Sequence, residues 1–316
     1  MIQERFLSAP FFADIAEGPE GGEAFWLATS DGVRIRAGVW PCPGAKGTVL
    51  ILPGRTECVE KYGRAAADLA ARGYASLAID WRGQGLADRA LPDRMAGHVE
   101  DFDEYQRDYQ AVLALAHGLG LPEPYYMIAH SMGGCIGLRA LIKGAGVQAA
   151  AFSAPMWGIS MAAWMRPVAA VISQVSAWMG QGHRFAPGTS DKSYIADAAF
   201  AGNVLTTDPE MWRYMRRQIL EHPELSLAGP SLAWLNAALG ECHALSLAPS
   251  PACPALTALG TAEKVVDPAP IHLRMARWQD GALDLYTGAE HEIMMEGPEE
   301  RARFFDRATA LFARTA

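Results

Sequence analysis

The chain has 316 residues, of which 50% are hydrophobic and 20% are charged. This composition is typical of a folded globular protein and excludes a largely disordered chain. The formal net charge is −8 and no run of lysine and arginine occurs, so we expect no nucleic acid partner. No stretch reaches the roughly 18 consecutive apolar residues that a membrane-spanning helix needs.

The N-terminal residues and the cysteines point to a cytoplasmic protein. Residues 1–6 lack the basic region and following apolar run of a signal peptide. The five cysteines are scattered, and none of them forms a C-x-x-C pair. An odd, scattered set of cysteines is typical of free thiols in a reducing compartment.

Short apolar segments alternate with helical segments along most of the chain. The segments with the pattern of strands are 24–40 (a hairpin), 48–52, 74–80, 125–129, 148–153, 254–260 and 282–286. The segments with helical spacing are 61–71, 101–119, 135–143, 268–278 and 298–313.

This order of elements predicts an α/β fold with a helical insertion. Strands that alternate with helices favour parallel βαβ units, and nearly continuous apolar strands are typical of a sheet covered on both faces. The alternation stops at Ala154-Pro155, and the next 80 or so residues read as helical and irregular. We therefore predict a mostly parallel eight-stranded sheet with helices on both faces, built from residues 1–155 and 236–316. A helical cap, residues 156–235, is inserted after its sixth strand.

Residues 129–134 carry the clearest chemical signal. They lie between a predicted strand and a predicted helix, with Ser131 at the centre of an A-x-S-x-G pattern. A sharp strand-to-helix turn of small residues around a serine lifts the hydroxyl above the sheet, and the usual pattern is G-x-S-x-G. Alanine at the first position is a small change. We predict that Ser131 is a nucleophile; the alternative is an ordinary glycine-rich turn.

Two backbone N–H groups are expected to form an oxyanion hole. One belongs to Met132, directly after the nucleophile. The other should come from the loop after the strand 48–52, where Arg55 is the best candidate. The alternative for this loop is a simple Pro-Gly turn.

A serine nucleophile needs a base and an orienting carboxylate, which follow it in the order acid, then histidine. His291 follows the last predicted strand and is the only one of the eight histidines in that place. Glu263 and Asp267 both follow the strand 254–260. We favour Glu263, three residues beyond the strand, because Asp267 precedes Pro268 and is also suited to cap a helix.

Several motifs in order resemble one enzyme family. They are Pro53-Gly54-Arg55-Thr56-Glu57, Asp80-Trp81-Arg82-Gly83-Gln84-Gly85, Gly97-His98-Val99, Ala129-His130-Ser131-Met132-Gly133-Gly134, Ser153-Ala154-Pro155-Met156, Asn203-Val204-Leu205-Thr206 and His291-Glu292-Ile293. With them the sequence resembles the serine α/β-hydrolases of the lysophospholipase and monoacylglycerol lipase family. It looks closest to the bacterial lysophospholipase branch.

Three positions depart from the monoacylglycerol lipase pattern. Those enzymes usually have His-Gly in place of Pro53-Gly54, Gly-His-Gly in place of residues 83–85, and an aspartate in place of Glu263. All three departures are similar to the lysophospholipase branch. The resemblance therefore implies an ester hydrolase rather than a strict monoacylglycerol lipase.

The start of the predicted cap is rich in methionine and tryptophan. Met156, Trp157, Met161 and Trp164 begin an apolar stripe that continues at helical spacing to Met179. Flexible methionine side chains suit acyl chains, and tryptophan suits a membrane interface. We expect these four residues to bind substrate and the cap to contact the inner face of the membrane peripherally. The alternative is that the stripe packs the insertion onto the core.

The sequence thus predicts a carboxylic ester hydrolase that forms a serine acyl-enzyme with a lysophospholipid or monoacylglycerol. No H-E-x-x-H motif, dinucleotide fingerprint or P-loop is present, so we expect no metal and no cofactor. One alternative is an aminopeptidase of the same fold, with Asp191, Asp197 and Asp208 binding the free amine of a peptide. Another alternative is a binding protein without catalytic activity.

Overall fold

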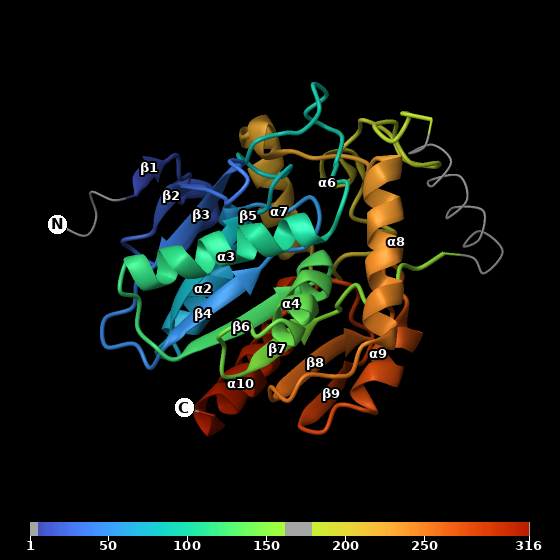
Figure 1. Ribbon diagram of the computed structural model, residues 1–316. Helices are drawn as coiled ribbons and strands as arrows, with labels where there is room; N and C mark the ends of the chain where they lie inside the picture. Colours follow the sequence, from blue (N-terminus) through green and yellow to red (C-terminus); the bar gives the residue numbers. More distant parts are fainter. Residues whose placement is uncertain (1–5, 162–178, 316) are drawn as a thin grey trace.

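A single sheet runs through the computed structural model, which describes residues 6–161 and 179–315 (Figure 1). Its nine strands are β1 (Leu7–Ala9), β2 (Glu23–Ala28), β3 (Arg34–Trp40), β4 (Thr48–Leu52), β5 (Ala75–Asp80), β6 (Tyr125–His130), β7 (Ala150–Ser153), β8 (Ala255–Gly260) and β9 (Gly281–Tyr286). They lie in the order β1-β2-β3-β5-β4-β6-β7-β8-β9. The pairs from β1 to β5 along this order are antiparallel, and all the others are parallel.

The mostly parallel sheet is confirmed, but the predicted number of eight strands is wrong. The additional strand is β1, which pairs with β2 at the edge of the sheet. It has only three residues, and the first two are exposed. A strand this short carries too little apolar alternation to be detected in the sequence.

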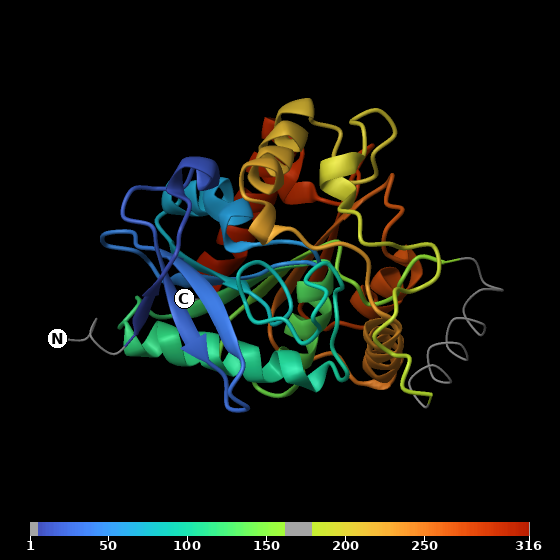
Figure 2. The same ribbon diagram turned by 90° about the horizontal axis from the view of Figure 1, so that it is seen from above.

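Helices cover both faces of the sheet, as predicted. One apolar core contains α3 (Asp103–Gly118), α4 (Met132–Ile142), α8 (Leu232–Leu247) and α9 (Pro268–Met275). The other core contains α2 (Gly63–Ala70), α7 (Pro209–Glu221) and α10 (Pro298–Arg314). Figure 2 shows α3 (green) on one side of the sheet and α7 (gold) on the other.

Alternating side chains of each strand supply the two cores. In β4, Leu50 and Leu52 belong to the first core, whereas Val49 and Ile51 belong to the second. This is the period of two that a strand imposes on its side chains. Because both faces are covered, residues 49–52 of β4 are all apolar.

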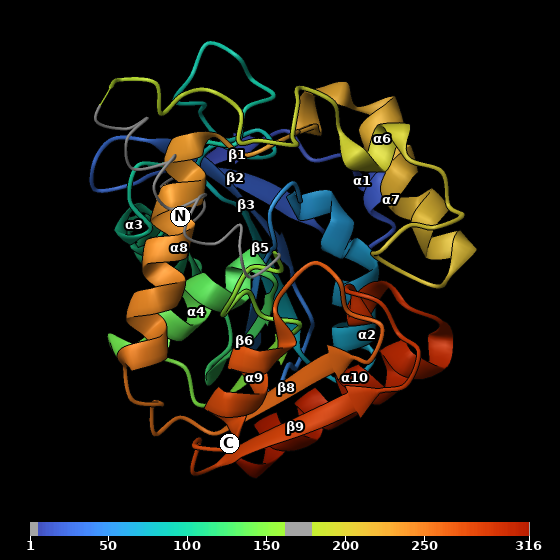
Figure 3. The same cartoon turned by 90° about the vertical axis from the view of Figure 1, so that its right-hand side faces the viewer.

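The predicted cap contributes short helices and the start of a long one. Its described parts hold α6 (Tyr194–Asp197), α7, the 3-10 turn η3 (Pro223–Leu225) and the first residues of α8. In Figure 3, α6 and α7 lie together on one side of the molecule and α8 lies on the other. Helix α8 runs through residue 235, the predicted end of the cap. The remaining short helices are α1 (Ala13–Ala16), η2 (Val59–Tyr62) and η4 (Ile293–Met295).

Part of the predicted apolar stripe, including Trp164, lies outside the described residues. Within the ranges 6–161 and 179–315, no helix is both long enough and apolar enough to cross a membrane.

A buried ion network fastens the loops beside the carboxyl ends of the central strands. Arg36 in β3 contacts Asp80 at 2.7 Å and Glu60 at 2.6 Å, and all three side chains are fully buried. Asp80 also accepts hydrogen bonds from the N–H groups of Val59 and Leu86. The end of β5, the turn η2 and the loop after β5 are therefore held to one guanidinium.

We predict that Arg36→Met lowers the free energy of unfolding by about 3–5 kcal/mol, because it leaves two buried carboxylates without their cation. The matched control is Arg307→Met, which removes an ion pair to Asp284 from an arginine side chain that is 53% exposed. The control should lose less than about 1 kcal/mol. Urea denaturation of the three proteins measures the difference, and equal losses would contradict the prediction.

Candidate active site

The predicted nucleophile lies at the turn from β6 to α4. Ser131 has φ +50° and ψ −117°, a conformation that L-residues rarely adopt and that is typical of strained functional turns. A Cβ at Gly133 would lie 2.1 Å from the carbonyl oxygen of Leu52, and one at Gly134 would lie 2.5 Å from the Cβ of Pro155. The two glycines therefore let α4 begin directly behind the serine.

The structure brings Ser131, His291 and Glu263 together in one chain of hydrogen bonds. The hydroxyl of Ser131 donates to Nε2 of His291 at 3.0 Å, and Nδ1 of His291 donates to Oε2 of Glu263 at 2.7 Å. The acid follows β8 and the histidine follows β9, which are neighbours in the sheet. This is the geometry in which a histidine can take the proton of a serine while a carboxylate orients the ring.

Glu263 is held in its ionised form. Burial alone would raise the pKa of this carboxyl, but His291 and two backbone donors outweigh burial and lower the pKa below its usual value. The two donors are the N–H groups of Val265 and Val266, both to Oε1. One carboxylate oxygen is thus fixed by the loop, and the other remains for the imidazole.

Asp267, the alternative acid, begins α9. Its side chain accepts a hydrogen bond from the N–H of Ala269 at 3.0 Å, with Pro268 as the first helical residue. This is the N-cap arrangement that the sequence suggested for it. In the structure, the acid that lies beside His291 is therefore Glu263.

The loop that carries His291 is tied to residues 203–207, which we call the anchor segment. The N–H groups of His291 and of the next residue donate to two carbonyl oxygens of this segment at 3.4 and 2.8 Å. Glu296 accepts from both the hydroxyl and the N–H of Thr207, at 2.6 and 2.8 Å. The same carboxylate accepts the N–H of Glu290. A segment of the predicted cap thus helps to position the histidine.

The loop around Arg55 presents one free backbone N–H. The N–H of Gly54 donates to Glu57, and that of Thr56, whose φ is +66°, donates to Gln84. Within the part of the chain that the structure describes, neither Arg55 nor Met132 uses its N–H in a hydrogen bond. Both N–H groups are therefore available to an oxyanion. The oxyanion hole itself remains a prediction.

Next to these residues lies a cluster of buried charges that the sequence analysis missed. The Glu57 cluster consists of Glu57, Lys61, Tyr62, His130 and Glu292. The ammonium of Lys61 lies 2.8 Å from Glu57 and 2.5 Å from Glu292, and the hydroxyl of Tyr62 donates to Glu57. The spacing of four residues between Glu57 and Lys61 was the one available signal in the sequence.

Burial and the ammonium set the protonation of this cluster. Burial would raise the pKa of Glu57, but Lys61, His130 and the hydroxyl of Tyr62 together outweigh it and lower the pKa below its usual value. Burial lowers the pKa of His130 to about 3, so this ring is neutral. It packs against the ring of His291 with centroids 4.8 Å apart, and its Nδ1 donates to the carbonyl oxygen of Ser153. Because His130 is neutral, it does not repel a positive charge that forms on the ring of His291.

Three members of the Glu57 cluster have the composition of a metal site. Glu57, His130 and Glu292 offer ligand atoms that lie within 4.8 Å of one another. The ammonium of Lys61 lies between the two carboxylates and supplies the positive charge there. These residues therefore fit a structural charge cluster better than a site for a metal ion.

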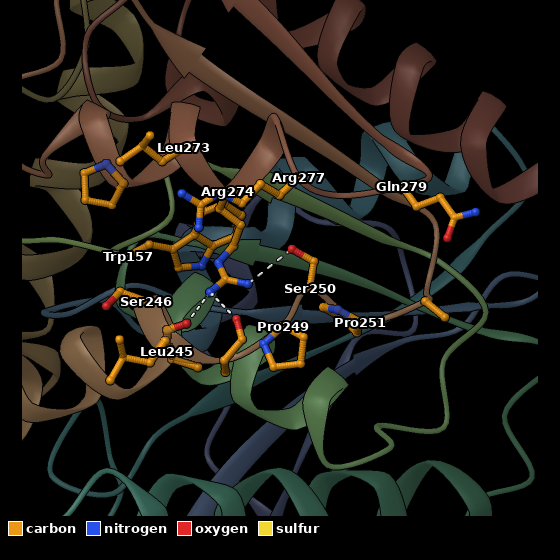
Figure 4. Close-up of a pocket in the computed structure, with 14 residues that line it drawn as sticks. Trp157, Leu245, Ser246, Pro249, Ser250, Pro251, Leu273, Arg274, Arg277 and Gln279 are labelled. Atoms are coloured by element: carbon orange, nitrogen blue, oxygen red, sulfur yellow. Dashed lines mark hydrogen bonds between the residues drawn. The ribbon is translucent and has the colours of Figure 1, made fainter.

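Two of the predicted substrate-binding residues are buried. Met156 is 5% exposed and Trp157 is 3% exposed, and the indole of Trp157 donates to the carbonyl oxygen of Gly134. Trp157 also lines a pocket of about 700 Å³ beside Arg274 (Figure 4), and none of the three triad residues lines it. Met161 is partly exposed, and Trp164 is not among the described residues. Their role in substrate binding stays a prediction.

The comparisons with known proteins agree with this geometry. Residues 43–298 match the sequence model of the family described as "Serine aminopeptidase, S33". The chain belongs to this family. The resemblance to serine α/β-hydrolases is thereby confirmed, and the protein is a serine hydrolase.

Relatives of known name lie among lipid ester hydrolases. Lysophospholipase L2 of Escherichia coli K12 is 34% identical over 249 residues, which are 78% of this chain and 69% of the relative. Monoacylglycerol lipase of Mycolicibacterium smegmatis is 27% identical over 85% of this chain and 90% of its own length. A solved monoglyceride lipase of Saccharomyces cerevisiae shares the fold, with a TM-score of 0.68, 20% identity and coverage of 92% and 95% of the two chains.

We predict that Glu263→Gln lowers kcat/KM for an ester substrate by roughly 10³- to 10⁴-fold, because a neutral amide no longer fixes the tautomer or balances the charge of the imidazole. Asp267→Asn is the matched control, since asparagine still caps a helix. Steady-state kinetics of both variants measure the two effects. A larger loss in Asp267→Asn would transfer the role of the acid to that residue.

We predict that the pH dependence of stability reports on His130. Its folded-state pKa of about 3 lies below the ordinary value of 6.5, so the unfolded chain binds a proton below that pH and the folded protein does not. The wild type should therefore lose about 1 kcal/mol more than His130→Asn when the pH falls from about 7.5 to about 5.5. Urea denaturation at both pH values tests this, and an equal loss in the two proteins would show that His130 titrates normally.

Proposed function

We propose that this protein hydrolyses carboxylic esters of single-chain lipids through an acyl-enzyme on Ser131. The observation that carries the proposal is the continuous set of hydrogen bonds from Ser131 through His291 to Glu263 at a strained strand-to-helix turn. The relatives named lysophospholipase L2 and monoacylglycerol lipase support a lysophospholipid or a monoacylglycerol as substrate.

Each residue has a defined task in this reaction. The hydroxyl oxygen of Ser131 attacks the ester carbonyl while Nε2 of His291 takes its proton. The developing oxyanion accepts hydrogen bonds from the N–H groups of Met132 and Arg55. His291 then protonates the leaving alcohol, and a water molecule attacks the acyl-enzyme by the same route in reverse. Glu263 remains ionised and holds the ring throughout.

The acyl chain is proposed to lie beneath the cap of residues 156–235, with Met156, Trp157, Met161 and Trp164 as its apolar lining. Exposed apolar side chains on the described part of the cap, Met179 and Leu220, support peripheral contact with a lipid surface. The five cysteines are all free, which supports a reducing, cytoplasmic location.

The aminopeptidase alternative needs carboxylates that can bind the free amine of a peptide. Asp208 caps α7 by accepting from the N–H groups of Glu210 and Met211. Asp191 and Asp197 are exposed at the surface of the cap. None of the three is a buried acid beside the triad, so lipid ester hydrolysis is the better supported function.

We predict that Ser131→Ala abolishes hydrolysis of a lysophospholipid and of a monoacylglycerol, with an unchanged circular dichroism spectrum. A fluorophosphonate probe should label the wild type at Ser131 and leave the variant unlabelled. Turnover that persists in Ser131→Ala would remove Ser131 from the mechanism. A folded wild type that neither reacts with the probe nor hydrolyses either ester would favour a binding protein.

A further inference from the structure

Three arginines of the described chain share an unusual environment. Burial lowers the pKa of Arg55 and of Arg89 to about 10 each, and it also lowers the pKa of Arg274. In the described ranges, none of these three side chains forms an ion pair with a carboxylate. A buried cation is costly unless its N–H groups find acceptors, so the acceptors of each arginine are informative.

Arg89 and Arg274 have their acceptors within the protein. Arg89 donates three hydrogen bonds to backbone carbonyl oxygens at 2.9 to 3.3 Å. Arg274 donates to two carbonyl oxygens at the C-terminal end of α8 and to the hydroxyl of Ser250, as Figure 4 shows. Both are structural arginines whose charge the backbone dipoles stabilise.

Arg55 has only one acceptor among the described residues. Its Nη1 donates to the carbonyl oxygen of Ala228 at 2.5 Å. The guanidinium lies over the ring of Trp234 at 5.6 Å, but a ring face attracts the charge without accepting two directed hydrogen bonds. Within the described residues, Nε and Nη2 form no hydrogen bond, and the residue is only partly buried. A planar pair of donors is thus left for a ligand.

The position of these donors relates them to the reaction. The backbone N–H of the same residue is the proposed second donor to the oxyanion, so the side chain of Arg55 starts beside the place where an ester carbonyl would bind at Ser131. Gly97 lets the guanidinium lie close to the backbone, since a Cβ there would lie 3.1 Å from Nη1. A guanidinium fork is well suited to two oxygens of one phosphate.

We propose that the guanidinium of Arg55 binds the headgroup phosphate of a lysophospholipid whose ester carbonyl lies at Ser131. The inference rests on the proposed function and narrows it, because a neutral monoacylglycerol has no group that pairs with this cation. Arg55 is then the residue that determines the preference for phosphate-bearing single-chain lipids.

The test compares two substrates with the same acyl chain, a lysophosphatidylethanolamine and a monoacylglycerol, below their micellar concentrations. The measured quantity is the ratio of kcat/KM for the first substrate to kcat/KM for the second. We expect Arg55→Met to lower this ratio by roughly 10- to 100-fold, because two charge-assisted hydrogen bonds are lost while the backbone N–H remains. Arg55→Lys keeps the positive charge but lacks the planar pair of N–H donors, so it should lower the ratio less than Arg55→Met does.

Arg89→Met is the matched control, since it removes another partly buried arginine that has its own acceptors, and it should leave the ratio unchanged. The rate of fluorophosphonate labelling at Ser131 checks that each variant has an intact site. If Arg55→Met does not fold, Arg55→Lys and Arg55→Gln supply the same comparison.

An unchanged ratio in a labelled Arg55→Met would overturn the inference and leave the proposed function standing. Weaker inhibition by the free fatty acid, with the ratio unchanged, would assign Arg55 to the carboxylate of the product instead, which also overturns it. A wild type that reacts with the fluorophosphonate probe but hydrolyses neither lipid would refute the proposed function itself.

Discussion

The close approach of α4 to the strands behind it is the constraint on which the active site depends. No side chain fits at Gly133 or Gly134, because Leu52 and Pro155 lie against the backbone there. With the helix so near, the chain can leave β6 only through a sharp turn, and Ser131 takes the left-handed φ at that turn. The N-terminal end of α4, with its partial positive charge, consequently lies directly behind Ser131.

Sequence patterns identify the parts of this site that depend on local order. The strands β2 to β9 are continuous or alternating apolar segments, and the residues Ser131, His291 and Glu263 follow the ends of three of them. The sequence favoured Glu263 over Asp267, and the structure adds the contacts: Glu263 lies 2.7 Å from Nδ1 of His291, whereas Asp267 caps α9. Strand β1 could not be found, since three residues at an exposed edge carry no periodic signal.

The cluster of buried charges around Glu57 could not be predicted from the sequence for a different reason. Glu57 and Glu292 lie at opposite ends of the chain, and each resembles a solvated surface charge until the fold brings both to Lys61. Glu57 also holds the N–H of Gly54 and the hydroxyl of Tyr62. The carboxylate of Glu57 therefore balances the charge of a buried ammonium and also fixes the loop that presents the N–H of Arg55. A substitution at Glu57 would change both the charge balance and the shape of the site.

The anchor segment has a consequence for the evolution of substrate choice. Residues 203–207 belong to the predicted cap by sequence, yet they hydrogen-bond the loop that carries His291. A chimera whose replacement cap did not present these carbonyl oxygens and the donors of residue 207 in the same place would lose the bonds that position the imidazole. Sequence changes are accordingly easier to accommodate in the parts of the cap before and after this short stretch, where they leave the hydrogen bonds to the His291 loop intact.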